Sequence, residues 1–140
     1  MIPDVDLARV ILAGLLGAVA MALTALFFNA IRVPVVDIGR LIATKLLGYH
    51  SSGTRIGLAL HMSTGIVLAL IYALIAPAIP GPALLHGIGY GILLWLFMMV
   101  VVLPSMGDGF FGRNSTTPMM GSALVTHLLY GVVLSLGVQH

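Results

Sequence analysis

Residues 7–30 read LARVILAGLLGAVAMALTALFFNA, an apolar run interrupted only by Arg9, Thr24 and Asn29. A helix needs about 20 mainly apolar residues to cross the hydrocarbon core of a bilayer, so this run is long enough for one crossing. The segment before it, MIPDVDLAR, carries two aspartates where a signal peptide has a basic region, and the apolar run exceeds the usual signal-peptide core. We therefore expect the first span to be retained.

Three further apolar runs follow, at about residues 56–77, 83–103 and 119–139, and each is long enough for one more crossing. Prolines, which start or stop helices, lie near the ends of these runs: Pro77, Pro80, Pro82, Pro104 and Pro118. Lipid offers no hydrogen bond to a backbone group, so spanning segments are helices or closed barrels, and barrel strands are alternating segments of about 10 residues. We predict an all-α integral membrane protein, an antiparallel four-helix bundle in a single domain over residues 1–140.

The composition supports this class and excludes others. Of the 140 residues, 60% are hydrophobic and 7% are charged, whereas about a quarter of a soluble domain is charged. The absence of cysteine excludes disulfides, c-type haem attachment, iron–sulfur clusters and thiol nucleophiles. Six Lys and Arg residues are too few and too scattered for a nucleic-acid interface. The expected partners are therefore the lipid bilayer and other membrane protein subunits.

The basic residues are distributed unevenly between the two ends of the predicted bundle. The first and third connections carry Arg32, Arg40, Lys45, Arg55 and Arg113, against only Arg9 on the other side. Cytoplasmic loops carry the excess of Lys and Arg. We expect these two connections in the cytoplasm and both termini on the outer, periplasmic side, together with the uncharged second connection, APAIPGP at residues 76–82.

The first connection is longer than a turn and contains a predicted amphipathic helix at about residues 36–47. Its two faces carry Asp37, Arg40 and Thr44 on one side and Ile38, Leu41, Ile42 and Leu46 on the other. Such a helix is expected to lie flat in the membrane interface. It either shields the bundle from below or offers a docking surface to a cytoplasmic partner.

A ten-residue pattern occurs twice in the chain: HMSTGIVLAL begins at His61, and HLLYGVVLSL begins at His127, 66 residues later. The repetition suggests two related helical hairpins in parallel orientation. Residues four apart share a helix face, and in both spans that face places the histidine in a stripe of small residues. These stripes are Gly57, His61, Gly65, Ala69 and Ala73 in one span, and Ala123, His127, Gly131 and Ser135 in the other.

Small residues at this spacing allow membrane helices to approach closely. The first span has Gly14, Ala18 and Ala22 at the same spacing, and the third has Gly87 and Gly91. We therefore predict a close-packing seam on all four helices, with Gly14, Ala18, Gly57, Gly87 and Gly91 at helix contacts.

The two histidines of the repeat admit two interpretations. In the first, each imidazole donates a hydrogen bond to a carbonyl or hydroxyl group on a neighbouring helix. In the second, His61 and His127 are the axial ligands of one b-type haem, and Gly65 and Gly131 leave room for the porphyrin. Their predicted depths differ by only about 5 Å at 1.5 Å of rise per residue, so a shared ligand is geometrically possible. No metal site is predicted apart from the iron of such a haem.

Other polar side chains in the spans are expected to bond to neighbouring helices. His86 lies at the outer end of the third span, in the opposite leaflet from His61, where it serves as a polar cap. Trp95 stands near the middle of that span, so its indole N–H needs a partner. For Tyr90 and Tyr130, interhelical hydrogen bonds are the first reading, and contact with a quinone or a lipid headgroup is the second.

Transport and catalysis are both disfavoured by what the spans lack. Charged residues inside the membrane usually mark a transport pathway, and the predicted spans contain none firmly within the membrane. No nucleophile is paired with a base, and the motifs for phosphate binding, zinc hydrolysis and acyl transfer are missing. The sequence therefore predicts a protein that is not an enzyme.

Several short motifs lie in a recognisable order. His61, Gly65, Tyr72 and Ala73 form an H-x-x-x-G-x-x-x-x-x-x-Y-A span, which a G-Y-G-x-x-x-W span (residues 89–95) and a T-H-L-x-Y-G span (residues 126–131) follow. In this order the chain resembles an uncharacterised family of four-span bacterial inner-membrane proteins. The resemblance implies a stand-alone four-helix fold in the inner membrane, in which His61 and His127 belong to the family pattern.

Two functional hypotheses follow from the sequence. The first is a non-catalytic accessory or structural subunit, which packs its small-residue seams against a larger membrane complex, respiratory or photosynthetic. The second is an electron carrier that binds haem b through His61 and His127. The paired H-x-x-x-G stripes motivate the second hypothesis, and the low charge with little mass outside the membrane motivates the first.

Overall fold

The computed structural model describes residues 6–35, 39, 42–48, 53–114 and 119–138. Every regular element within these residues is helical. The long helices are α1 (Leu7–Ala30), α3 (Gly53–Ile75), α4 (Ala83–Phe97) and α6 (Met120–Gly137). The short elements are η1 (Ile42–Leu46), η2 (Ala76–Ala78), η3 (Met98–Val102), α5 (Leu103–Ser105) and η4 (Phe110–Gly112).

Four helices of the described chain are long and apolar enough to cross a membrane. They cover Leu7–Ala30, Arg55–Ala78, Ala83–Ser105 and Met120–Gly137. The third of these continues without a break from α4 through the π-helical turn η3 into α5. The predicted all-α fold with four spanning helices is thus confirmed, and the span boundaries differ from the expected ones by only a few residues.

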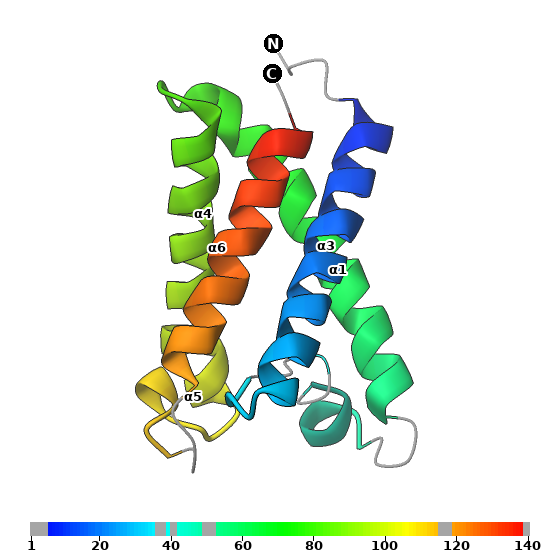
Figure 1. The fold of residues 1–140 in the computed structure, drawn as a ribbon, viewed down its shortest axis with the longest axis vertical. Coiled ribbons are helices and arrows are strands. Elements are labelled where there is room, and N and C mark those ends of the chain that lie inside the picture. The colour runs from blue at the N-terminus through cyan, green and yellow to red at the C-terminus, as the bar shows by residue number, and fades with distance from the viewer. Residues whose placement is uncertain (1–5, 36–38, 40–41, 49–52, 115–118, 139–140) are drawn as a thin grey trace.

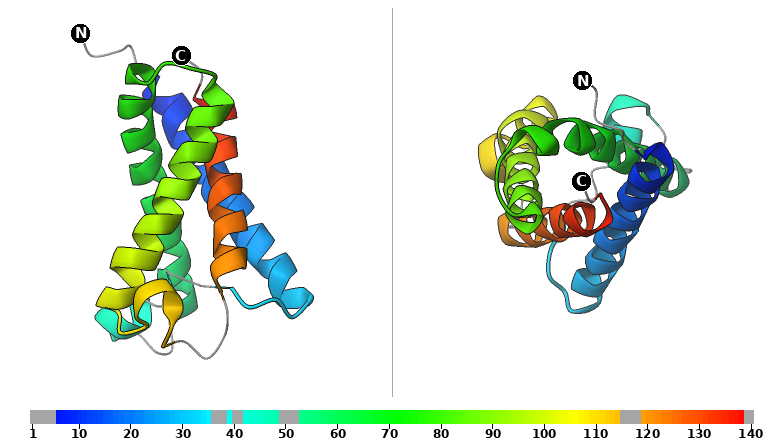
Figure 2. Two further views of the ribbon diagram at one scale, coloured as in Figure 1. Left: turned by 90° about the vertical axis from the view of Figure 1, so that its left-hand side faces the viewer. Right: turned by 90° about the horizontal axis from the view of Figure 1, so that it is seen from above.

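Successive long helices run antiparallel, so the start of α1 and the end of α6 lie at the same end of the bundle (Figure 1). We call this the terminal end, and it also carries the connection between η2 and α4. The opposite end, named here the basic end, carries the first and third connections. Around the bundle α1 packs against α3 and α6, and α6 packs against α4 (Figure 2).

The helices pair into two hairpins that use the same kind of contact. Between α1 and α3, a Cβ atom added to Gly14 would lie 2.8 Å from both the Gly65 carbonyl oxygen and the Ala69 Cβ atom. Between α4 and α6, a Cβ atom on Gly91 would lie 2.5 Å from the His127 carbonyl oxygen. Backbones at such separations tolerate no side chain, which is how small residues bring membrane helices together.

The core is divided into two clusters of buried residues. The larger lies toward the terminal end and includes Val10, Ala69, Tyr72, Tyr90 and Leu134. There α4 meets α3: the rings of Tyr72 and Tyr90 have centroids 5.2 Å apart, and the Tyr90 hydroxyl donates to the Leu68 carbonyl oxygen at 2.7 Å. The smaller cluster, Met98, Met99, Leu103 and Ala123, joins η3 and α5 to α6 near the basic end.

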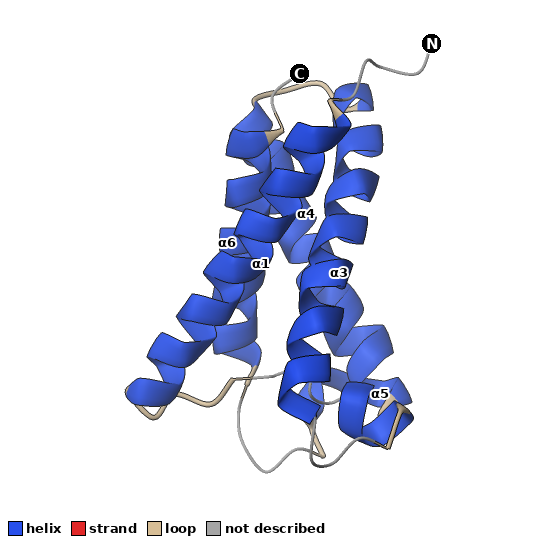
Figure 3. Ribbon diagram, turned by 90° about the vertical axis from the view of Figure 1, so that its right-hand side faces the viewer, coloured by secondary structure: helices blue, strands red, loops and turns tan. Residues whose placement is uncertain are grey.

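Toward the basic end α1 and α6 lean away from α3 (Figure 3). The first and third connections join across this end, where the Lys45 ammonium group lies 3.3 Å from Asp108 Oδ1 and donates to the Met106 carbonyl oxygen at 3.1 Å. Exposed ion pairs of this kind contribute at most about 1 kcal/mol. The pair therefore aligns the connections more than it stabilises the fold.

Part of the predicted interfacial helix at residues 36–47 falls within the described chain. Residues 42–46 form the π-helical turn η1, which packs against α3 and buries Ala43 completely. Residues 36–38 and 40–41 lie outside the described residues. Gly39 is described and helical, and it packs directly against the Gly57 backbone.

Candidate ligand cavity

A cavity of about 390 Å³ lies between the four long helices, in the half of the bundle nearer the basic end. Its walls come from residues 18–29 of α1, 57–68 of α3 and 123–130 of α6, with Val35, Leu94 and Met98 completing them. Known small-molecule sites have volumes of about 300–1,000 Å³ and mostly apolar walls with a few polar groups. The cavity meets both conditions.

The cavity begins where α1 separates from α3 (Figure 3). At Ala18 the two helices are still in contact, since a Cβ atom on Gly65 would lie 2.8 Å from the Ala18 Cβ atom. Farther along α1 the residues facing α3 are Ala22 and Ala25, which line the cavity and are too short to fill it. Met21 and Met98 also contribute to its apolar wall.

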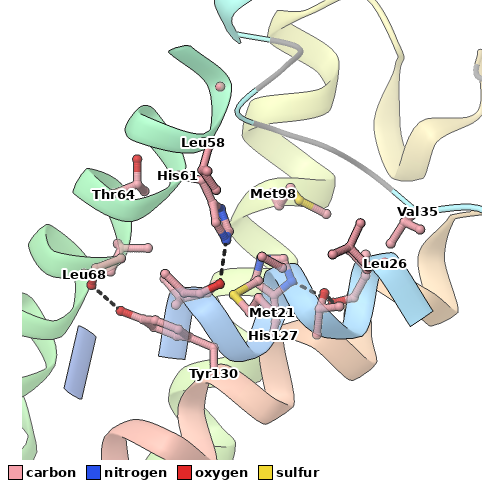
Figure 4. Close-up of a pocket in the computed structure, with 18 of the residues that line it drawn as sticks. Met21, Leu26, Val35, Leu58, His61, Thr64, Leu68, Met98, His127 and Tyr130 are labelled. Carbon is pink, nitrogen blue, oxygen red and sulfur yellow. Dashed lines mark hydrogen bonds between the residues drawn. The ribbon is translucent and has the colours of Figure 1, made fainter. Parts of the chain in front are cut away.

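His61 reaches into the cavity from α3, and its Nε2 atom lies 3.1 Å from the Ala18 carbonyl oxygen of α1 (Figure 4). A carbonyl oxygen only accepts hydrogen bonds, so this ring nitrogen carries the proton. An imidazolium is costly inside a membrane. The neutral ring then has a lone pair on Nδ1, for which the described residues provide no donor.

His127 enters the same cavity from α6 (Figure 4). Its Nδ1 atom donates to the Ala123 carbonyl oxygen, one turn earlier on the same helix, at 2.7 Å. The lone pair of the neutral ring is therefore on Nε2. The structure thus brings together the two histidines that stand 66 residues apart in the sequence. Each has one nitrogen bound to a backbone carbonyl group and the other without a partner among the described residues.

Two buried residues with hydroxyl groups, Thr126 and Tyr130, also line the cavity. Tyr130 is only 1% exposed, and its hydroxyl donates to the Gly65 carbonyl oxygen at 2.5 Å. Thr126 Oγ1 donates to the Ala123 carbonyl oxygen at 2.9 Å. Both hydroxyl groups thus donate their protons to backbone carbonyl oxygens.

The exposed residues of the cavity wall belong only to α1 and α3. Leu26 and Asn29 of α1 are exposed, as are Leu58 and Thr64 of α3, whereas the lining residues of α4, η3 and α6 are buried or half-buried. Leu26 and Leu58 are 64% and 53% exposed. The cavity therefore opens sideways between α1 and α3, on a surface composed of spanning helices.

The family of unknown function DUF6789 matches residues 5–140, nearly the whole chain. The chain belongs to this family. No curated protein and no solved structure matches it. The expected resemblance to an uncharacterised family is confirmed at that level, and the family description assigns no activity.

Gly65 and Gly131, the glycines that follow the two histidines, have different surroundings in the structure. Gly65 lines the cavity, but it also packs closely against Gly14 and Ala18 of α1. Gly131 packs directly against Gly87 of α4 and is not among the lining residues. Both glycines thus make helix contacts, and of the two only Gly65 borders the cavity.

Four further residues of the predicted stripes also line the cavity: Ala18, Ala22, Gly57 and Ala123. The candidates His86 and Trp95 lie outside it. Trp95 donates its indole N–H to the Met120 carbonyl oxygen of α6 at 3.1 Å. His86 lies near the terminal end of α4, and its buried Nε2 atom has no hydrogen-bond partner in the described structure. Among the described residues, no group of three or more His, Asp or Glu side chains is arranged to hold a metal ion.

Sequence reasoning missed Ala25, Asn29 and Met98 as cavity residues. The small residues of α1 indicated a close helix contact, but their spacing predicted that this contact would continue through Ala22. In the structure the seam ends at Ala18, and Ala22 faces the cavity instead.

Proposed function

We propose that this protein is a non-catalytic membrane protein that takes a small amphipathic molecule from the lipid phase into the cavity and holds its polar end at His61 and His127. The observation that carries the proposal is the convergence of the two imidazoles on one cavity, each fixed by a backbone carbonyl group and each with a lone pair that no donor of the described chain binds. The sideways opening between α1 and α3 supports access from the bilayer.

The chemistry of the wall favours binding over catalysis or ion transport. None of the described residues that line the cavity is charged, and none is a cysteine or a serine. The Tyr130 and Thr126 hydroxyl groups bond to carbonyl oxygens and not to a histidine that would activate them. A wall of this kind retains a ligand by shape and by a few hydrogen bonds.

The proposal predicts that a small molecule remains with the purified protein and depends on both histidines. Native mass spectrometry of protein released from nanodiscs prepared directly from the host membrane is expected to show a bound species. His61→Phe and His127→Phe each remove a polar contact at the cavity and should lose it. His86→Phe changes a histidine outside the cavity and should retain it. If the wild type carries nothing that the double variant His61→Phe/His127→Phe lacks, the proposal is wrong.

Haem b is a second candidate ligand, which the arrangement of His127 favours. A histidine that binds a metal normally donates its other ring N–H to a carbonyl or carboxylate oxygen, as His127 Nδ1 does here. In His61 the Nε2 atom already donates to the Ala18 carbonyl oxygen, so ligation through that atom requires the ring to leave this bond. A Soret band that disappears in His127→Ala supports haem, and no band after expression with haem supplied rejects it.

The role as an accessory subunit stays a prediction. It requires that a partner protein bind to the outer surface of the bundle. The Gly14 and Gly87 seams are occupied within the chain itself, so a partner has to approach elsewhere. Gly89 and Gly121 are exposed glycines with open space where a side chain would stand. Specific recovery of another membrane protein from native membranes, lost in Gly89→Leu or Gly121→Leu, is the result that supports this role.

We further propose that the protein lies in the bacterial inner membrane with its basic end in the cytoplasm. The support is the excess of Lys and Arg on the connections at that end. Because the chain has no cysteine, single substitutions label uniquely. A membrane-impermeant maleimide added to cells with a permeabilised outer membrane is expected to label Pro80→Cys, whereas Asn114→Cys reacts only after lysis. The reverse pattern would show the opposite orientation.

A further inference from the structure

Among the described residues, the buried and half-buried polar side chains of the cavity wall offer acceptors and no free donor. Four polar side chains lie there, and each uses its proton on a backbone carbonyl oxygen: His61, Thr126, His127 and Tyr130. These groups therefore present only lone pairs to the cavity. Among the described residues, no donor binds the lone pair of either imidazole ring. Asn29 and Thr64, which carry further donors, are exposed and lie at the opening.

A cavity whose buried and half-buried polar groups are all acceptors selects its ligand by hydrogen-bond polarity. A buried acceptor without a donor is penalised by the loss of its hydration, so a ligand that brings only carbonyl oxygens leaves both histidines unsatisfied. A ligand with hydroxyl groups satisfies them. Because the two acceptors come from different helices, α3 and α6, a ligand with two hydroxyl groups satisfies both and a ligand with one does not.

The walls and the opening define the remainder of the ligand. Met21 and Met98 line the interior, and thioether side chains pack favourably against aromatic rings. The opening carries the exposed side chains of Leu26 and Leu58, which suit an apolar chain leading into the bilayer. The volume of about 390 Å³ is sufficient for one substituted ring and not for an entire lipid.

We infer that the cavity binds a lipid-soluble hydroquinone, whose two hydroxyl groups donate to His61 Nδ1 and His127 Nε2 while its apolar chain leaves between α1 and α3. This inference rests on the proposed function and specifies its ligand class. The oxidised quinone has the same ring and chain but only carbonyl acceptors, so the site distinguishes the two redox forms by binding the reduced one.

The test compares three probes of nearly equal shape with the full-length protein in nanodiscs under anaerobic conditions. They are decyl hydroquinone, the corresponding decyl quinone and the dimethyl ether of the hydroquinone. Two hydrogen bonds of ordinary strength correspond to a difference of about 10- to 30-fold in affinity. The hydroquinone is therefore expected to bind at least about 10-fold more tightly than either other probe.

Variants separate a specific site from general partitioning into lipid. His61→Phe and His127→Phe should each remove most of the preference for the hydroquinone, whereas His86→Phe should preserve it. Equal, histidine-dependent binding of all three probes overturns the donor inference and leaves the cavity's binding function standing. Failure of all three probes, with another molecule found by native mass spectrometry, also overturns only the inference. Failure of both experiments overturns both proposals.

Discussion

Replacement of Gly87 or Gly91 by alanine is expected to unfold the contact between α4 and α6, whereas the same replacement at Gly89 should leave the bundle intact. The three glycines lie on one helix at alternate positions, and only two of them face α6. A Cβ atom on Gly91 would lie 2.5 Å from the His127 carbonyl oxygen, and one on Gly87 would overlap the Gly131 backbone. At Gly89 there is open space.

The expected loss is large because the obstructing atoms belong to a backbone. A flexible side chain rotates away from an added methyl group, but here α4 and α6 have to separate along their length. Overpacking typically costs about 1–3 kcal/mol, and we expect the upper end at Gly87 and Gly91. Gly89→Ala should be neutral or slightly stabilising, by up to about 1 kcal/mol, because alanine favours the helix more than glycine does.

Unfolding in mixed micelles of sodium dodecyl sulfate and dodecyl maltoside, followed by circular dichroism, measures these differences directly. The unfolding midpoint should fall for Gly87→Ala and Gly91→Ala and remain near the wild-type value for Gly89→Ala. Equal midpoints for all three variants would contradict the close contact between α4 and α6.

Tyr130→Ala is expected to have the second large effect, since this side chain joins three helices. It projects from α6, its ring covers Gly17 of α1, and its hydroxyl donates to the Gly65 carbonyl oxygen of α3. Truncation of a buried aromatic residue to alanine costs about 3–5 kcal/mol. It also extends the cavity toward the terminal end, because Tyr130 forms part of the wall.

Tyr130→Phe separates packing from hydrogen bonding at this position. The ring is retained and only the bond to Gly65 is lost, which is worth about 0.6–2 kcal/mol between membrane helices. The same micelle titration should therefore place Tyr130→Phe between the wild type and Tyr130→Ala. A loss as large for phenylalanine as for alanine would show that the hydroxyl, and not the ring, maintains the junction.

The sequence was sufficient to predict the spans but not which helices pair through their small residues. Apolar runs bounded by prolines predict long apolar helices, and so all four helices that are able to cross a membrane could be located. A stripe such as Gly57, Gly65 and Ala69 shows only that some backbone comes close. Whether Gly65 meets Gly14 or a partner protein depends on the packing of the whole bundle.

The candidate site could likewise be predicted only in part. The matching positions of His61 and His127 in the repeat indicated two related side chains, and the structure places both at one cavity. The direction in which each ring donates depends on the nearest carbonyl group, which for His61 belongs to α1 and cannot be deduced from its own helix. The cavity itself arises where Ala22 and Ala25 fail to reach α3, a consequence of helix angle that no local pattern records.

The meeting of α3 and α4 through Tyr72 and Tyr90 has a consequence for how the protein responds to its membrane. This contact holds α3 and α4 together toward the terminal end, whereas the bundle opens toward the basic end. The cavity volume therefore depends on the relative tilt of the helices more than on any one short side chain. Spanning helices adjust their tilt to the thickness of the surrounding hydrocarbon. A change in bilayer thickness is therefore expected to change the volume of the cavity, with the tyrosine contact as the fixed point.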